Sequence, residues 1–209
     1  KQFLQSAGLG VAPYHNVESE ADLVHALGDF GGGILKTRRF GYDGKGQKVF
    51  HDGQCGDPAA VFSELGGGPF VLEQKIEFTS EFSVIAARGL SGESSFYDPA
   101  TNRHEHGILR QSTVPATLSQ RHIDQAGQMA LTLLNALDYT GVIGVEFFAA
   151  PDGLLINEFA PRVHNSGHWT REACSVSQFE QHIRAVAGLD LGPVARHHDC
   201  QMFNLLGDE

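Results

Sequence analysis

Two glutamates in neighbouring apolar segments are the residues of this sequence best suited to hold a metal ion. Glu146 lies in the run Gly144–Phe148 and Glu158 in the run Leu154–Phe159, and the turn Pro151-Asp152-Gly153 lies between them. If the runs pair as a hairpin, the two carboxylates face each other and repel unless a cation joins them. Carboxylates and nucleotide phosphates are typical Mg²⁺ ligands. The alternative is a pair of solvent-facing acids, but the flanking residues are more apolar than a wet sheet face requires.

A polar string follows the second glutamate, in the segment 160–169. Arg162 can hold a planar oxyanion through two hydrogen bonds, and His164 and Asn165 can donate others. A structured loop with scattered polar side chains is the alternative. Polar side chains directly after a candidate metal ligand favour function, so we predict these three as catalytic residues.

A glycine-rich loop at residues 40–47 follows a short predicted strand that ends near Lys36. Its glycines let backbone N–H groups face an anion, and Lys36 and Lys45 add positive charge. The spacing is neither that of a P-loop nor that of a Rossmann fingerprint. A hairpin loop with solvated lysines explains the composition equally well. The candidate phosphate-binding residues are Lys36, Gly41, Tyr42, Asp43, Gly44, Lys45, Gly46 and Gln47.

The residues alone give weaker evidence for further nucleotide contacts. A strand end between two lobes exposes backbone groups that could pair with an adenine edge, although an ordinary strand end is the favoured interpretation. Two later polar residues could contact a ribose or a phosphate, but a surface or structural role is more common. These candidates are Glu73, Gln74, Lys75, Ile76, Glu81 and His104.

The predicted helices and strands follow one another without clear βαβ units, which favours an α+β class. Apolar spacing and caps predict helices over 1–7, 20–27, from 57–58 onward, 119–137 and 177–187. Alternation predicts strands or extended segments over 11–17, 34–36, 48–51, 70–74, 81–88, 94–97, 108–114, 142–149 and 154–159. We expect a small α+β lobe at 11–75 and a larger one at 76–190. Residues 1–10 would end a helix from a preceding domain, and 191–209 would begin a following one.

Composition excludes several classes of function. The net charge of −10 disfavours binding to nucleic acid backbones. No apolar run approaches the roughly 20 residues that span a bilayer. Three scattered cysteines form no C-x-x-C pair and fit a reducing cytosol. The first residues contain no signal-peptide core and no initiator Met, so we expect a fragment.

The order of these groups resembles the ATP-grasp superfamily: Lys36, the glycine loop, the Glu73 segment, Glu146 and then Asn157-Glu158. Longer strings resemble the 5-(carboxyamino)imidazole ribonucleotide synthetase family more specifically. They are Leu35-Lys36-Thr37-Arg38, the loop 41–47, His106-Gly107-Ile108-Leu109-Arg110, Asn157 to Thr170 and Ser177-Gln178-Phe179-Glu180.

The resemblance implies an ATP-grasp fold whose two lobes clamp ATP between mainly antiparallel sheets. Lys36 and the loop 41–47 would contact phosphates, and residues 73–76 would meet adenine. Glu81 would lie near the ribose, and His104 and Asn157 near the nucleotide. Glu146 and Glu158 would hold Mg²⁺, and Arg162, His164 and Asn165 would hold bicarbonate or carboxyphosphate.

The implied activity is ATP- and bicarbonate-dependent carboxylation of aminoimidazole ribonucleotide in purine biosynthesis, by a cytoplasmic homodimer. Family members extend beyond both ends of this chain, so we expect ATP binding without full turnover. A formate-dependent glycinamide ribonucleotide transformylase and a nucleotide-binding module without turnover are the alternatives.

Overall fold

The computed structural model describes residues 1–39, 46–205 and 207. The chain forms two compact units. The smaller unit comprises Ala12–Ile76 with His106–Ile108, and the larger comprises Lys1–Val11, Glu77–Glu105 and Leu109–Glu209. The segments 1–10 and 191–209, which we predicted as parts of further domains, belong to the larger unit. The predicted boundary after residue 75 differs by one residue from the end of the smaller unit's main segment.

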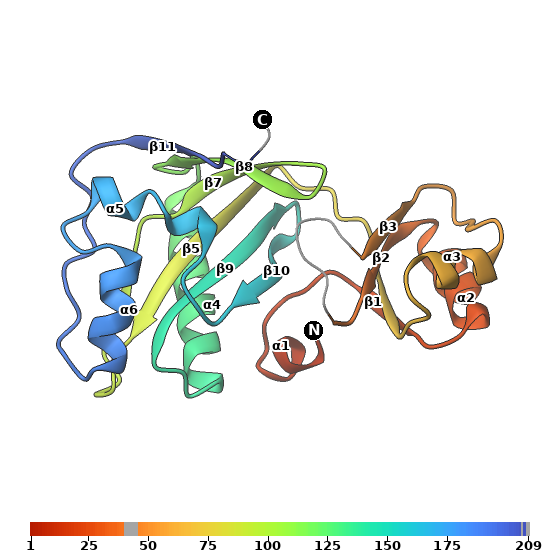
Figure 1. Ribbon diagram of the computed structural model, residues 1–209, viewed down its shortest axis with the longest axis horizontal. Coiled ribbons are helices and arrows are strands. Elements are labelled where there is room, and N and C mark those ends of the chain that lie inside the picture. The colour runs from red at the N-terminus through yellow and green to blue at the C-terminus, as the bar shows by residue number, and fades with distance from the viewer. Residues whose placement is uncertain (40–45, 206, 208–209) are drawn as a thin grey trace. The chain divides into compact units, whose positions relative to one another are not determined.

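The smaller unit is a four-stranded antiparallel sheet in the order β1-β4-β2-β3, with two helices packed on it (Figure 1). Its core joins Leu35 of the sheet to Leu23 and Leu27 of the first helix and Val61 of the second. The elements are β1 (Tyr14–Val17), α2 (Glu20–Phe30), β2 (Gly33–Thr37), β3 (Gln47–Phe50), α3 (Pro58–Glu64) and β4 (Phe70–Glu73).

Local sequence explains the limits of α2. The Ser19 side chain accepts from the Asp22 backbone, and the Asp22 carboxylate accepts from the Ser19 backbone in return, which completes a capping box. Gly31 ends the helix in the left-handed conformation, at φ 66°. The helix therefore begins and ends where the sequence supplies its caps.

The larger unit is built on a second sheet in the order β10-β9-β5-β7-β8-β11, and β6 pairs with β5 off this path. The strand pairs β9–β10, β5–β9, β5–β6, β5–β7 and β8–β11 are antiparallel. The strands are β5 (Ser80–Arg88), β6 (Ser94–Phe96), β7 (Ala100–Glu105), β8 (Ile108–Val114), β9 (Gly141–Ala150), β10 (Gly153–Ala160) and β11 (Cys200–Phe203). The helices are α1 (Gln2–Ser6), α4 (Gln120–Ala136), the 3₁₀ turn η1 (Asn165–Gly167), α5 (Thr170–Ala173) and α6 (Gln178–Val186).

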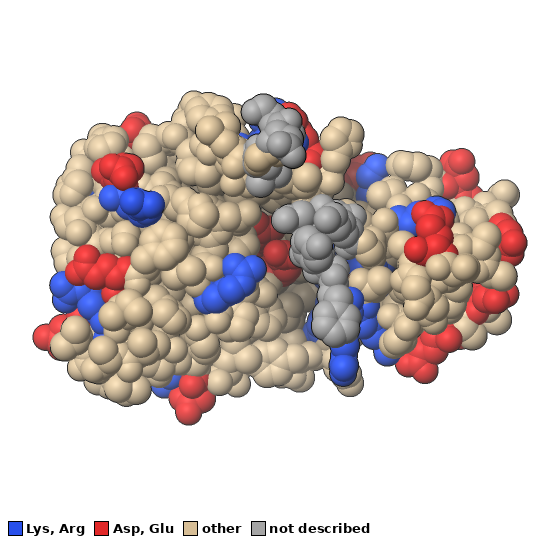
Figure 2. Space-filling view, viewed as in Figure 1, with Lys and Arg blue, Asp and Glu red and all other residues tan. Residues whose placement is uncertain are grey.

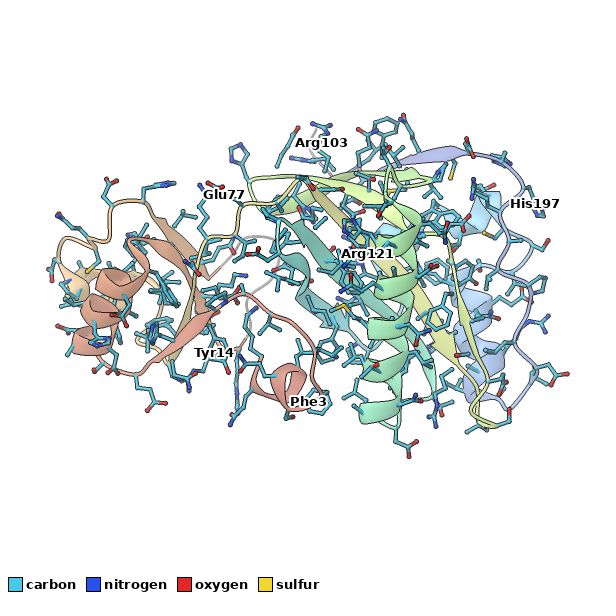
Figure 3. The ribbon with its side chains drawn as sticks, turned by 180° about the vertical axis from the view of Figure 1, so that it is seen from behind. Phe3, Tyr14, Glu77, Arg103, Arg121 and His197 are labelled. Carbon is cyan, nitrogen blue, oxygen red and sulfur yellow. The ribbon has the colours of Figure 1, made fainter. Side chains whose placement is uncertain are left out.

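Helices cover both faces of this sheet. Helix α4 packs against β5 and β9 on one face, and Figures 1 and 3 show α5 and α6 on the other. On the α5 and α6 face, Ile85 and Val142 pack with Trp169 and Ala173. Because side chains alternate along a strand, Ser83 and Glu146 point to this same face.

The predicted helices and strands are confirmed within a few residues, as is the α+β class. The prediction lacked β7, α5 and β11, which are short and carry weak patterns. Among the described residues, no helix is long and apolar enough to cross a membrane. Basic and acidic side chains are interspersed over the face seen in Figure 2.

Candidate functional site

The hairpin of β9 and β10 places Glu146 directly opposite Glu158. Near the turn the ladder is regular, and Ile156 pairs with Phe147. A continued regular ladder would bring Asn157 opposite Glu146. Instead the register shifts between Ile156 and Glu158, which is a β-bulge with two residues of one strand opposite one of its partner. The predicted opposition of the two carboxylates is thus confirmed, and the bulge produces it.

The two carboxylates differ in exposure. Glu146 is 4% exposed, in a central strand, whereas Glu158 is exposed on the edge strand β10. One possible ligand atom from each of Glu146, Glu158 and His164 lies within 4.8 Å of the others. The alternative of two solvent-facing acids therefore fails for Glu146, and a cation could meet both carboxylates.

His104 and Glu81 form a second group around the same buried carboxylate. His104 Nδ1 lies 3.0 Å from Glu81 Oε2, and His104 Nε2 lies 3.9 Å from Glu146 Oε1. Burial alone would lower the pKa of His104, but the Glu81 contact and the charges of Glu146 and Glu158 outweigh it and raise that pKa. Although the sequence made His104 a weak candidate, strand β7 brings it to these acids.

His164 lies against the same sheet face because Gly144 leaves room for it. A Cβ on Gly144 would lie 2.5 Å from the His164 Cβ. The His164 Nε2 lies 4.0 Å from Glu146 Oε1, and its Nδ1 lies 2.8 Å from the Ser166 hydroxyl. Burial, and then the charges of Arg162 and neighbouring histidines, lower the pKa of His164 to about 4. The imidazole is therefore neutral near pH 7.

The other two residues of the predicted anion site make local contacts. The exposed Arg162 guanidinium donates to the Val163 carbonyl at 2.8 Å. Asn165 Oδ1 accepts from the Ser166 backbone at 2.9 Å. Of the three, the His164 side chain lies beside the carboxylates in the part of the chain that the structure describes.

In the smaller unit, Lys36 and Glu73 form an ion pair of 3.0 Å on one face of the sheet. Glu73 is only 7% exposed, so the ammonium has a fixed and largely buried partner. The Gln74 N–H donates to the Pro13 carbonyl at 2.9 Å. That N–H is therefore already bonded, whereas Lys75 and Ile76 lie beyond the end of β4.

The glycine-rich loop is described only at its far end. The Gly46 carbonyl accepts from the Thr37 N–H at 2.8 Å, and Gln47 pairs with Lys36. The predicted phosphate contacts Gly41, Tyr42, Asp43, Gly44 and Lys45 lie outside the described residues.

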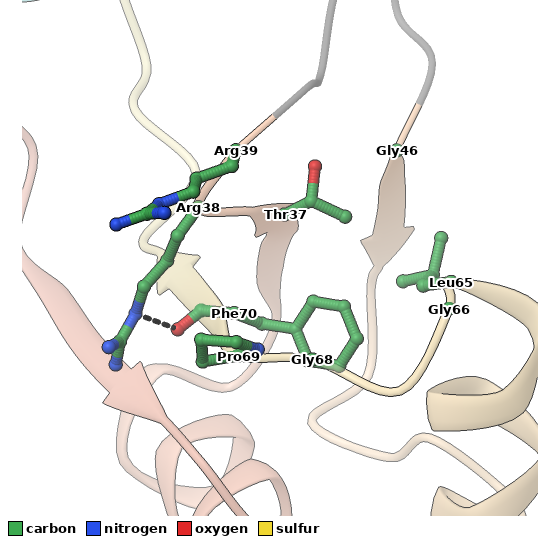
Figure 4. Close-up of a pocket in the computed structure, with 9 residues that line it drawn as sticks. All are labelled: Thr37, Arg38, Arg39, Gly46, Leu65, Gly66, Gly68, Pro69 and Phe70. Atoms are coloured by element: carbon green, nitrogen blue, oxygen red, sulfur yellow. Dashed lines mark hydrogen bonds between the residues drawn. The ribbon is translucent and has the colours of Figure 1, made fainter.

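A pocket of about 540 Å³ opens in the smaller unit beside these strand ends (Figure 4). Thr37, Gly46 and Phe70 are among its lining residues, and Arg38 Nε donates to the Phe70 carbonyl at 3.0 Å. Among the described residues, the lining does not include Lys36 or Glu73. The pocket is therefore separate from the ion pair.

Three residues that shape the site were not among the predicted site residues. Ser83 is in register with Glu146 on β5, and its buried hydroxyl has no hydrogen-bond partner among the described residues. Gly144 makes room for His164, and Gln178 bonds the His164 backbone. Glycine and isolated polar residues are common in any sequence. The strand register and the path of the loop show where these three residues lie and what they contact.

Comparison with known proteins decides the family. The family model described as an ATP-grasp domain matches residues 2–179. The chain belongs to the ATP-grasp family. The predicted ATP-grasp fold is thereby confirmed.

This ATP-grasp chain is 54% identical over 211 residues to the N5-carboxyaminoimidazole ribonucleotide synthase of Brucella melitensis, covering 100% of the chain and 58% of that protein. The crystal structure of the synthetase from Thermus thermophilus matches with a TM-score of 0.90 and 42% identity, over 100% of the chain and 56% of that structure. A synthase from Aspergillus clavatus, in complex with ADP and 5-aminoimidazole ribonucleotide, matches with a TM-score of 0.88 and 26% identity, over 99% and 55%. The chain thus spans a little over half the length of these similar proteins.

Proposed function

We propose that this chain is the ATP-grasp part of an enzyme that carboxylates 5-aminoimidazole ribonucleotide. ATP and bicarbonate would form carboxyphosphate, and the product would be 5-(carboxyamino)imidazole ribonucleotide, in de novo purine biosynthesis. The observation that carries the proposal is the 54% identity to the Brucella synthase along the whole chain. The ADP and 5-aminoimidazole ribonucleotide bound in the similar Aspergillus protein support the choice of substrates.

The donor set of the β9 and β10 hairpin fits Mg²⁺. Two carboxylates from facing strands supply hard oxygen ligands, and a strand pairing holds them opposite each other. Glu146 and Glu158 would hold the ion, with Asn157 beside them in the bulge. When bound, Mg²⁺ would neutralise phosphate charge during transfer.

The smaller unit would bind ATP through side chains and backbone. Lys36 would contact the phosphates, and its ion pair with Glu73 fixes the ammonium before the nucleotide arrives. The loop 41–47 would contact the phosphates, and residues 73–76 the adenine. In the larger unit, Glu81 would bind the ribose, and His104 would bind the nucleotide from its position beside Glu81 and Glu146.

Arg162, His164 and Asn165 would hold bicarbonate and then carboxyphosphate. His164 is neutral near pH 7, and its Nδ1 faces the Ser166 hydroxyl and N–H. If Nδ1 accepts from these groups, Nε2 carries the proton and can donate it to an anion. Arg162 would supply the positive charge that a neutral imidazole lacks. Phosphoryl transfer to bicarbonate would thus depend on positioning and charge, without a covalent protein intermediate.

The test is ADP release by the full-length protein with ATP, Mg²⁺ and 5-aminoimidazole ribonucleotide. We expect bicarbonate to stimulate ADP release and formate to leave it at the basal rate. Stimulation by formate with glycinamide ribonucleotide would support a transformylase instead. Nucleotide binding without stimulation by either would support a binding module and contradict the proposal.

Two further predictions concern the full-length enzyme. We expect a homodimer, which light scattering after gel filtration checks directly. We also expect a cytosolic location, which cell fractionation checks.

A further inference from the structure

A buried glutamine holds the backbone of the His164 loop. Gln178, the first residue of α6, is 0% exposed. Its Oε1 accepts from the His164 N–H at 2.9 Å, and its Nε2 donates to the His164 carbonyl at 2.6 Å. One carboxamide thus satisfies both backbone groups of a single residue, as a neighbouring strand would.

Other contacts hold Gln178 and the His164 backbone in place relative to each other. The Gln178 N–H donates to the Thr170 hydroxyl at 2.9 Å, and that hydroxyl donates to the Gly167 carbonyl at 2.7 Å. On the other side, the His164 Cβ lies against Gly144 of β9. The His164 backbone is therefore held between α6 and the sheet, which restricts where its ring can point.

A second glutamine on the same helix makes the same kind of contact elsewhere. Gln181 is also 0% exposed, and its Oε1 accepts from the Gly192 N–H at 2.8 Å. Its Nε2 donates to the Gly192 carbonyl at 3.0 Å and to the Ser95 hydroxyl at 3.0 Å. Gly192 lies in the segment after α6, so Gln181 is a matched control for a buried glutamine that bonds a backbone away from His164.

We propose that Gln178 is a positioning residue for the anion site and acts through His164. The inference rests on the proposed function of His164, because positioning matters only if that imidazole contacts the reacting anion. Gln178 itself touches the loop backbone and would not contact bicarbonate. Its removal should therefore reduce turnover more than nucleotide binding.

The kinetic test compares Gln178→Met with Gln181→Met in the full-length protein. Methionine is similar in length to glutamine but cannot form either pair of bonds. In Gln178→Met the buried His164 N–H loses its partner, whereas the His164 carbonyl keeps the Gly167 N–H at 3.0 Å. In Gln181→Met both backbone groups of the half-buried Gly192 lose the glutamine. We expect both variants to lower the melting temperature by a similar amount. We expect Gln178→Met alone to lower kcat for bicarbonate-dependent ADP release by about tenfold or more, with the KM for ATP within about twofold. Equal loss of kcat in both variants, or normal kcat in Gln178→Met, would overturn the inference.

The His164→Ala background tests whether Gln178 acts through His164. There, Gln178→Met should cause no further loss of kcat, because the ring it positions is gone. A further tenfold loss would show that Gln178 acts by another route, and would overturn the inference.

A spectroscopic test separates the inference from the proposed function. NMR of ring-labelled histidines, with the His164 signals assigned from His164→Ala, should show those signals moved by Gln178→Met and unmoved by Gln181→Met. Absent bicarbonate stimulation in the unaltered protein would contradict the proposed function, and the NMR comparison would still decide the positioning. If a methionine variant does not fold, Gln178→Asn and Gln181→Asn replace the pair, since asparagine keeps the uncharged carboxamide but is one methylene too short to make both backbone bonds. Unmoved His164 signals in the folded Gln178 variant would overturn the inference.

Discussion

One extra residue in β10 decides which side chain faces Glu146. A regular ladder from the turn would pair Glu146 with Asn157, and the bulge gives that place to Glu158. Two carboxylates opposite each other, one of them in a central strand, repel and oppose folding unless a cation or a proton offsets them. The proposed metal site accounts for this facing pair, because a bound cation would offset the repulsion.

The first prediction concerns this pair. Glu146→Gln and Glu158→Gln should each weaken binding of ATP in the presence of Mg²⁺ by about tenfold or more, because each removes a charged oxygen ligand. Isothermal titration with and without Mg²⁺ measures the effect. Asp152→Asn is the matched control, since it removes an exposed acid from the turn of the same hairpin. Unchanged binding by Glu158→Gln would contradict the metal assignment.

The second prediction concerns Cys174, which is buried in the core against Trp169 and Ala173. Burial, and then the charges of neighbouring groups, raise the pKa of its thiol to about 11. Since the thiolate is the reactive form, Cys174 should resist thiol reagents at pH 8 until the protein unfolds. Labelling of native protein should be the same with and without Cys174→Ser, and a slower or smaller native reaction in that variant would contradict the prediction.

At the scale of elements, β9 and the His164 loop fit together only because residue 144 lacks a side chain. A Cβ at Gly144 would lie 2.5 Å from His164 Cβ and 2.8 Å from its Cγ. These atoms are close to the His164 backbone, which Gln178 holds by a hydrogen bond. They therefore cannot move away without a cost in stability. A small residue in the strand thus sets the place of a ring in the loop.

The third prediction compares two glycines. Gly144→Ala should lower the free energy of unfolding by about 1–3 kcal/mol, because the added methyl forces His164 and its loop to shift. Gly127→Ala, within α4, should raise it by up to about 1 kcal/mol, because a Cβ there meets nothing within 4 Å and alanine favours the helix. Urea denaturation of the three proteins measures both. Equal effects of the two substitutions would contradict the close contact at Gly144.

How far the sequence predicted these elements depends on the strength of each local signal. Helices α2 and α4 have caps and a clear apolar stripe, so their limits followed from the residues. Strands β7 and β11 have no strong alternation, and their pairing with distant strands defines them. Local pattern thus predicted the helices with caps and the strands with clear alternation, and missed these two strands, which tertiary pairing defines.

The site was predictable in its residue types and less so in its geometry. The facing of Glu146 and Glu158 was predicted, but the bulge that produces it was not visible in the spacing. His104 was a weak candidate because a single histidine carries little information, yet β7 brings it to 3.0 Å from Glu81. Gln178 was missed as a positioning residue because its contact spans 14 residues of chain and involves only the backbone of His164.

At the scale of the whole molecule, the chain is two units that each carry part of the predicted nucleotide chemistry. The smaller holds the Lys36–Glu73 ion pair, and the larger holds the carboxylate pair with His104 and His164. The chain covers 58% of the Brucella protein, so the turnover experiments use the full-length protein. Binding of the metal ion and of the phosphates can be measured on this chain alone, because Lys36, Glu146 and Glu158 all lie in it.

A crystal structure with Mg²⁺ and a nonhydrolysable ATP analogue would show directly whether these residues bind the metal ion and the phosphates. We predict an ion bound by carboxylate oxygens of both Glu146 and Glu158, with Lys36 on the phosphates. An ion or nucleotide bound away from these residues would contradict the proposed metal and phosphate site.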